Sequence, residues 1–224
     1  MVDIIEENNE CFGIIGYGKD GKYIDIQADF TVFATGGIGG LYKHSTNYRH
    51  LTGDSLAIAI NHNIKLQNID YIQIHPTTLY STKKGRRFLI SESVRGEGAV
   101  LFNSHMERFV DELLPRDVVA KAIQEEMKKD NKPYVWLSMK PIPTEMIKSH
   151  FPNIYKHCLE EGYDVTKECI PVVPSQHYFM GGIDVDKYSK TSMDRLYAVG
   201  ETACNGVHGK NRLASNSLLE SLVF

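Results

Sequence analysis

The sequence has no long apolar run. A membrane-spanning helix requires about 20 consecutive apolar residues, and every hydrophobic stretch of this sequence is much shorter. The opening stretch from Met1 to Glu10 is acidic and polar, unlike a signal peptide. We therefore expect a soluble cytoplasmic protein without a membrane partner.

The sequence also lacks an excess of charge of one sign. Lys and Arg number 25 against 28 Asp and Glu, which gives a net charge of −3 at pH 7. This balance offers no electrostatic reason to expect a nucleic-acid partner. The hydrophobic share of 42% is ordinary for a globular protein, and 224 residues suffice for one large domain or two modest ones.

Cysteines are few and scattered. The four of them, Cys11, Cys158, Cys169 and Cys204, show no C-x-x-C spacing, which is the usual mark of a zinc, iron–sulfur or redox site. We expect separate thiols, no disulfide framework and no metal site.

A dinucleotide fingerprint in its proper context is missing as well. Gly16-Tyr-Gly-Lys-Asp-Gly21 matches G-x-G-x-x-G in letters. The fingerprint, however, needs a helix after its third glycine, so that the helix N-terminus faces the pyrophosphate. Here Lys22-Tyr-Ile-Asp-Ile26 follows and alternates as a strand does. The motif therefore predicts the turn of a hairpin between strands at Cys11–Gly16 and Tyr23–Gln27.

Strand and helix patterns alternate along the rest of the chain. Strands are predicted where short apolar or alternating runs meet glycine or proline, at Phe30–Ala34, Tyr71–His75 (ending before Pro76), Phe88–Ser91, Ala99–Phe102 and Leu196–Val199. Helices are predicted at Ser55–Lys65, from Pro115 onward, and at Thr144–His150, Asn153–Glu161 and Leu213–Phe224. This mixture indicates an α+β or α/β fold.

One glycine loop stands in a place that suits a cofactor. Ala34-Thr-Gly-Gly-Ile-Gly-Gly40 follows the predicted buried strand Phe30–Ala34. Glycines there would let the backbone approach a bound group closely. Taken alone, such a loop is a tight turn as often as a cofactor loop.

The chain carries an ordered set of short motifs. In sequence order they are Ala34-Thr-Gly-Gly37, Thr52-Gly-Asp54, His75-Pro-Thr77, Arg95-Gly-Glu-Gly98, Pro115-Arg-Asp117, His177-Tyr178 with Gly181-Gly182, Gly200-Glu201 and His208-Gly-Lys-Asn-Arg212. Each motif is weak by itself. The set, from about residue 31 to the end, resembles the flavoprotein family of fumarate reductase, succinate dehydrogenase and L-aspartate oxidase.

Within that family the sequence favours one branch. Leu213-Ala-Ser-Asn-Ser-Leu-Leu-Glu220 looks like L-aspartate oxidase, because the respiratory flavoproteins usually have glycine where Ala214 stands. His75-Pro-Thr-Thr-Leu-Tyr80 and Phe151-Pro-Asn-Ile-Tyr155 lean the same way. The alternative is the flavoprotein subunit of a fumarate reductase or succinate dehydrogenase.

The resemblance implies a fold and a cofactor. It implies a partial FAD-binding domain at residues 1–67 and 180–224, with an α+β substrate-capping domain inserted at 68–179. The ADP-binding unit of the family would lie upstream, so the chain reads as an internal fragment. FAD would be bound non-covalently by the whole protein, and we expect the fragment alone to retain little FAD and to show no turnover.

The resemblance also implies a dicarboxylate site. A buried pocket for two carboxylates needs cationic or hydrogen-bonding groups at each end, which an arginine fork and histidines supply. The residues implied as substrate ligands are His75, Ser91, Glu92, His177 and Arg212, and Arg116 matches the catalytic, proton-transferring arginine. The residues implied for the flavin are Thr35, Gly36, Gly37, Asp54, Glu201, Ser217 and Leu218.

The implied reaction is the oxidation of L-aspartate to iminoaspartate, with oxygen or fumarate as acceptor, in NAD biosynthesis. The product would pass towards quinolinate, which suggests a functional link to quinolinate synthase. Plainer readings stay open for single residues. His75 could be a satisfied core histidine, Arg116 a solvated residue at a helix start, and Arg212 a helix cap. Lys83-Lys-Gly-Arg-Arg87 is read as a solvated loop.

Overall fold

The computed structural model describes residues 1–224, which form two compact units. The first unit comprises Met1–Leu41, Arg49–Gln73 and Tyr178–Phe224, and the second comprises Tyr42–Tyr48 and Ile74–His177. Each unit has its own apolar core. Assigning a FAD-binding domain to 1–67 and 180–224 and a capping domain to 68–179 stays a prediction.

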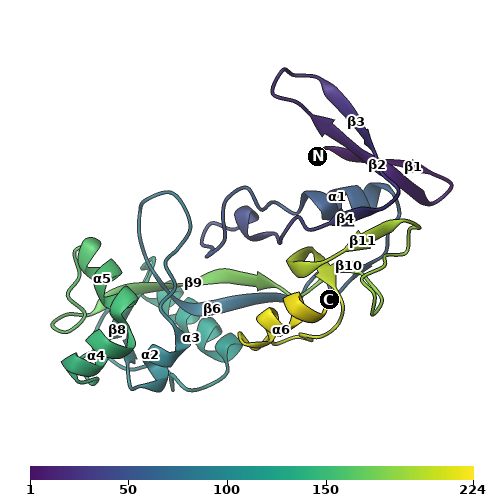
Figure 1. Ribbon diagram of the computed structural model, residues 1–224. Coiled ribbons are helices and arrows are strands. Elements are labelled where there is room, and N and C mark those ends of the chain that lie inside the picture. The colour runs from purple at the N-terminus through teal and green to yellow at the C-terminus, as the bar shows by residue number, and fades with distance from the viewer. The chain divides into compact units, whose positions relative to one another are not determined.

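The first unit begins with a three-stranded antiparallel sheet, drawn in purple in Figure 1. Its strands are β1 (Asp3–Glu7), β2 (Glu10–Tyr17) and β3 (Tyr23–Gln27). The Gly18 N–H donates to the Lys22 carbonyl at 2.8 Å and closes the turn. The predicted hairpin is therefore confirmed, and the G-x-G-x-x-G letters mark a turn. Strand β1 was not predicted, because its sequence is largely acidic.

The remaining strands of this unit form two small sheets. Strand β4 (Thr31–Phe33) pairs in parallel with β11 (Leu196–Ala198), and β10 (Gly182–Asp184) lies between β5 (Leu66–Gln67) and β12 (Ala203–Cys204). The predicted buried strand at Phe30–Ala34 is observed over Thr31–Phe33, but it is not buried on both faces. Thr31 and Phe33 are buried, but Val32 between them is 56% exposed, so one face alone meets the core.

Helices complete the first unit. They are α1 (Asp54–Asn61), α6 (Asn216–Val223) and the short 3-10 turns η1 (Gly39–Leu41) and η2 (Gly200–Thr202). Ile58 of α1 packs with Phe33, Ile183 and Leu196 in the core. Both α-helices were predicted, but each is shorter than its apolar pattern suggested.

The second unit is built on a four-stranded sheet. Its strand order is β6 (Ile72–Leu79), β9 (Ile170–Phe179), β8 (Val135–Ser138) and β7 (Val100–Phe102). Four helices belong to the same unit (Figure 1): α2 (Glu92–Gly96), α3 (Arg116–Lys129), α4 (Thr144–His150) and α5 (Pro152–Glu160). Apolar residues from strands and helices together form its core.

Two strand predictions in this unit need correction, and two of its strands, β8 and β9, were not predicted. Strand β6 does not stop at Pro76 but runs on to Leu79, which is possible because β6 is an edge strand of the sheet. Phe88–Ser91 is not a strand and makes only an isolated bridge from Leu89 to Thr78. Strand β9 was missed because it contains Pro171 and Pro174.

The two prolines of β9 lie differently with respect to the neighbouring strand β8. Strand β8 pairs with β9 only at Ile170–Val172, so Pro174 lies beyond that ladder. Pro171 lacks a donor but still accepts from the Tyr80 N–H at 2.9 Å. None of the helices in the structure combines the length and the apolar character needed to cross a bilayer.

Candidate active site

A buried histidine lies at the centre of the second unit's polar residues. His75 on β6 is 1% exposed. Burial first, then the electrostatic interactions with His177, Arg116 and Arg95, lower the pKa of His75 well below its usual value. His75 is therefore a neutral imidazole at pH 7.

The Thr77 backbone leaves two tautomers open to His75. Its Nδ1 lies 3.0 Å from the Thr77 carbonyl and 3.2 Å from the Thr77 N–H. Nδ1 donates to the carbonyl only when it is protonated, and accepts from the N–H only when it is not. In the second arrangement the proton is on Nε2, where it can be donated to a carboxylate.

A second histidine lies beside the first. The rings of His75 and His177 have centroids 5.4 Å apart and meet edge to face at 72°. The hydroxyl of Thr46 lies 2.9 Å from Nδ1 of His177. The structure thus brings together two of the predicted substrate ligands and adds Thr46, which the sequence analysis did not name.

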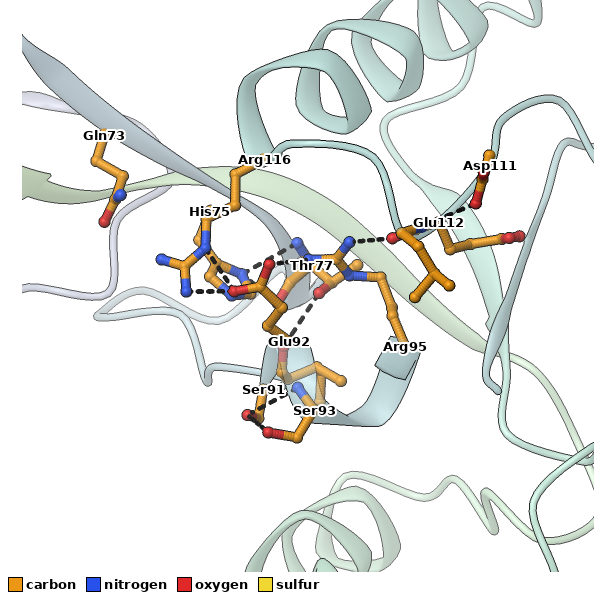
Figure 2. Close-up of polar contacts among 12 residues, drawn as sticks. Gln73, His75, Thr77, Ser91, Glu92, Ser93, Arg95, Asp111, Glu112 and Arg116 are labelled. Atoms are coloured by element: carbon orange, nitrogen blue, oxygen red, sulfur yellow. Dashed lines mark hydrogen bonds and ion pairs between the residues drawn. The ribbon is translucent and has the colours of Figure 1, made fainter. Parts of the chain in front are cut away.

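Arg116 and Glu92 form an ion pair next to these histidines. Arg116 is the first residue of α3 and Glu92 the first of α2. Arg116 Nε donates to Glu92 Oε2 at 2.7 Å, and Nη2 donates to the same oxygen. The Arg116 side chain is 14% exposed and that of Glu92 is 47% exposed. Figure 2 shows the Glu92 carboxylate between Arg116 and a second arginine, Arg95.

Arg95 is a buried cation that the sequence analysis passed over. Its side chain is 1% exposed, Nη1 donates to the Glu112 carbonyl at 2.6 Å, and Nη2 lies 3.9 Å from Glu92 Oε1. Its Nε and Nη2 have no hydrogen-bond partner. Burial lowers the pKa of Arg95, and Glu92 opposes that effect. Its only signal in the sequence was the Arg95-Gly-Glu-Gly98 motif.

Ser91 has a structural task in this conformation. Its hydroxyl caps α2 by accepting from the Ser93 N–H at 3.3 Å. The same hydroxyl donates to Ser93 Oγ at 3.3 Å. The substrate contact predicted for Ser91 stays a prediction.

In the first unit, Arg212 is held from three sides. Its Nη1 donates to Gln73 Oε1 at 3.0 Å, and Gln73 Nε2 donates back to the Arg212 carbonyl at 2.9 Å. Its Nε donates to the Ser217 hydroxyl, and its guanidinium lies 4.2 Å from the centre of the Tyr178 ring. Arg212 is 9% exposed, so it is not a solvated helix cap.

A buried carboxylate supports this arrangement. Glu220 on α6 is 5% exposed and accepts from the Tyr178 hydroxyl at 3.2 Å, from His208 Nε2 at 2.6 Å and from Asn205 Nδ2 at 2.9 Å. Burial and the charge of Glu220 raise the pKa of Tyr178. The phenol therefore stays protonated and donates to Glu220.

The predicted flavin residues all lie in the first unit. Strands β4 and β11 are parallel with Phe33 opposite Ala198, so both chains leave the sheet at the same edge. A Cβ added to Gly37 would lie 2.4 Å from Glu201 Oε1, and Gly36 has φ +75°. Glycine at position 37 therefore lets the backbone lie against the Glu201 carboxylate, which also accepts from the Phe179 N–H at 2.8 Å. A carboxylate at the ends of parallel strands suits the hydroxyl groups of a nucleotide cofactor.

The other predicted flavin residues differ from one another in their exposure and in their contacts. The Thr35 hydroxyl lies 2.6 Å from the Ser55 hydroxyl and donates to the Thr202 hydroxyl at 3.1 Å. Asp54 is exposed at the start of α1 and accepts from the Thr52 hydroxyl at 2.6 Å. Ser217 contacts Arg212, and Leu218 is 74% exposed. Their roles at the cofactor stay predictions.

Known proteins agree with this architecture. The profile of the family described as FAD binding domain matches residues 1–218. The chain belongs to the FAD binding domain family. The predicted resemblance to the flavoprotein family of fumarate reductase, succinate dehydrogenase and L-aspartate oxidase is confirmed, and so is the α+β fold. FAD is the cofactor that this family supports.

Individual relatives narrow the branch. The chain is 59% identical to the L-aspartate oxidase of Clostridium perfringens and 56% identical to that of Clostridium acetobutylicum, with 100% of this chain covered in each case. It is 34% identical to a solved quinol–fumarate reductase with menaquinol, with a TM-score of 0.87, covering 100% of this chain and 42% of that one.

The alignment is complete for this chain but not for its relatives. The chain covers 51% and 52% of the two clostridial proteins. It therefore spans about half the length of the curated relatives that it matches.

Proposed function

We propose that the whole flavoenzyme that contains this chain oxidises L-aspartate to iminoaspartate. The observation that carries the proposal is the group of Arg116 and Arg95 around the neutral, buried His75, which suits an anionic substrate. The preference for L-aspartate rests on the 59% identity to an L-aspartate oxidase. The second candidate, a fumarate reductase or succinate dehydrogenase subunit, rests on the 34% identical structural relative.

Each unit offers proposed ligands for a substrate carboxylate. His75 and His177 are the proposed ligands in the second unit, each donating from Nε2, and Ser91 is a further hydroxyl donor there. Arg212 is the proposed ligand in the first unit, where Gln73, Ser217 and Tyr178 already fix its guanidinium. A fixed planar fork recognises a carboxylate by two parallel hydrogen bonds and loses little entropy on binding.

Arg116 would balance charge and handle the proton at the reacting carbon. A lone guanidinium gives up a proton with difficulty. The Glu92 carboxylate, bonded to Arg116 and 3.9 Å from Arg95, is the neighbour that can take up and return a proton. Glu92 stays a proposed substrate ligand, and we also assign it a supporting role in proton handling next to Arg116.

The flavin would be held by Thr35, Gly36, Gly37, Asp54, Glu201, Ser217 and Leu218, without a covalent bond. When bound, FAD supplies the acceptor for the hydride that leaves the substrate Cα. Oxygen or fumarate would then take the electrons. We expect the isolated chain to retain little FAD.

We further propose where the reaction belongs in the cell. The four free thiols suit the reducing cytoplasm. The imine product would be passed on for quinolinate and hence NAD synthesis, which makes quinolinate synthase the expected functional partner.

Steady-state turnover tests the proposal. The whole flavoenzyme should consume L-aspartate and release hydrogen peroxide in air, with kcat/KM for L-aspartate far above that for succinate. A higher kcat/KM for succinate would favour the second candidate. Activity with neither dicarboxylate would reject both.

A further inference from the structure

The segment Tyr42–Tyr48 belongs to the second unit, and its residue Ser45 forms a bridge with Gln176 of β9. The Gln176 N–H donates to the His44 carbonyl, and the Thr46 N–H donates to the Gln176 carbonyl, each at 3.0 Å. The Ser45 hydroxyl donates to Gln176 Oε1 at 2.7 Å, and Asn47 Nδ2 approaches the same oxygen at 3.4 Å. The backbone and the side chains of Ser45 and Asn47 therefore anchor this segment.

The Thr46 side chain is not needed for that anchoring. Its hydroxyl lies 2.9 Å from His177 Nδ1 and 3.5 Å from the Gln176 carbonyl. The second distance is at the limit for a hydrogen bond, so the hydroxyl proton is better placed on Nδ1. The hydroxyl acts on the ring of His177 rather than on the backbone.

The position of one proton follows from this contact. When Thr46 donates to Nδ1, a neutral His177 carries its proton on Nε2. When His177 is doubly protonated, the hydroxyl turns and accepts from Nδ1–H. In both states Nε2 bears a proton, which is what a carboxylate acceptor requires. Only the neutral tautomer with Nδ1–H is unfit for that contact.

We propose that Thr46 is a positioning residue that fixes the ring of His177 and selects its Nε2–H tautomer for carboxylate binding. The inference rests on the proposed function, which makes His177 a ligand of the dicarboxylate. Thr46 itself does not need to touch the substrate. A hydrogen bond to the remote nitrogen of a histidine sets its tautomer in the same way at metal sites.

Two substitutions in the whole flavoenzyme separate the hydroxyl from the shape of the side chain. Thr46→Val keeps the branched shape and removes the hydroxyl. It should raise KM for L-aspartate about 3- to 10-fold, the value of one hydrogen bond, with little change in kcat. Thr46→Ser keeps the hydroxyl and should stay within about twofold of wild type.

The pH profile of kcat/KM distinguishes tautomer control from a packing effect. In Thr46→Val the defect should grow above the pH at which His177 loses its charge, because neutral His177 then lacks the donor that favours Nε2–H. Below that pH the imidazolium carries both protons, and the variant should approach wild type. A packing defect would lower kcat/KM equally at every pH.

The outcomes are separable. A wild-type KM and pH profile in Thr46→Val, or equal defects in the Val and Ser variants, would overturn the role of Thr46. Wild type run in parallel reports on the proposed function, since its failure to turn over L-aspartate would reject that function independently of any Thr46 variant.

Discussion

The guanidinium of Arg212 lies 4.2 Å from the centre of the Tyr178 ring. Gln73 and Ser217 bond the edges of the same guanidinium. Stacking on an aromatic face and bonding in the plane together fix both the tilt and the rotation of the fork. The arginine proposed for carboxylate binding is thus oriented before any ligand arrives.

Replacing either member of this pair should weaken substrate binding to different degrees. We expect Arg212→Lys to lower kcat/KM for L-aspartate about 100-fold, because an ammonium cannot reproduce two parallel bonds. Tyr178→Leu should cost about 3- to 10-fold through loss of the stack. Tyr178→Phe keeps the ring and serves as the control. Equal kcat/KM values in the Leu and Phe variants would show that stacking contributes nothing.

Glu220 should matter for stability. Glu220→Gln replaces one of two accepting oxygens with a donor, so at least one buried partner among Tyr178, His208 and Asn205 loses its acceptor. We expect the free energy of unfolding to fall by about 2 kcal/mol. Urea denaturation of the 224-residue chain measures it. Leu222→Gln is the matched control on α6, because Leu222 is 83% exposed. A Glu220→Gln midpoint equal to that of the control would refute the role given to Glu220.

The Arg116–Glu92 pair should control the rate of the chemical step. Arg116→Lys should lower kcat by at least about 100-fold with a smaller change in KM, because its interactions are proposed to count most in the transition state. Glu92→Gln keeps the size of the side chain and removes the ion pair, and should also act mainly on kcat. A variant that raises KM alone would assign this pair to binding and not to the reaction.

The buried neutral state of His75 should make stability depend on pH. The folded pKa is lowered, so below about pH 6.5 the unfolded chain binds a proton that the folded chain refuses. The stability contributed by neutral His75 is therefore present above the unfolded pKa and is lost as pH falls below it. His75→Asn retains a group that can bond the Thr77 backbone and cannot titrate.

Thermal unfolding of the chain between pH 5 and 7.5 measures this effect. Wild type should lose more stability than His75→Asn as pH falls across this range. Parallel curves for the two proteins would mean that His75 is charged in the folded state or equally titratable in both states.

Local signals in the sequence predicted three of the four helices of the second unit, α3, α4 and α5, and missed the short helix α2. Helix α4 was predicted at Thr144–His150, as observed, and proline followed by Arg116 and Asp117 predicts the start of α3. The strands were harder. Pro76 reads locally as a break, and only the order of strands in the sheet, which puts β6 at the edge, shows why it is tolerated.

Motif order named His75, His177, Arg116 and Arg212, but it could not reveal their supports. Thr46 meets His177 across 131 positions of sequence because its segment pairs with β9. Gln73 reaches Arg212 across 139 positions. Such partners have no local signature in the sequence. Before the chain folds, nothing distinguishes Thr46 or Gln73 from any other threonine or glutamine.

The central claim is that L-aspartate delivers a hydride from its Cα to the flavin. Anaerobic mixing of the FAD-loaded whole enzyme with L-aspartate tests it most directly, with flavin absorbance as the readout and succinate as the comparison. L-aspartate should bleach the flavin rapidly, more slowly when deuterated at Cα, and succinate should perturb the spectrum without bleaching it. Rapid bleaching by succinate with none by L-aspartate would contradict the account.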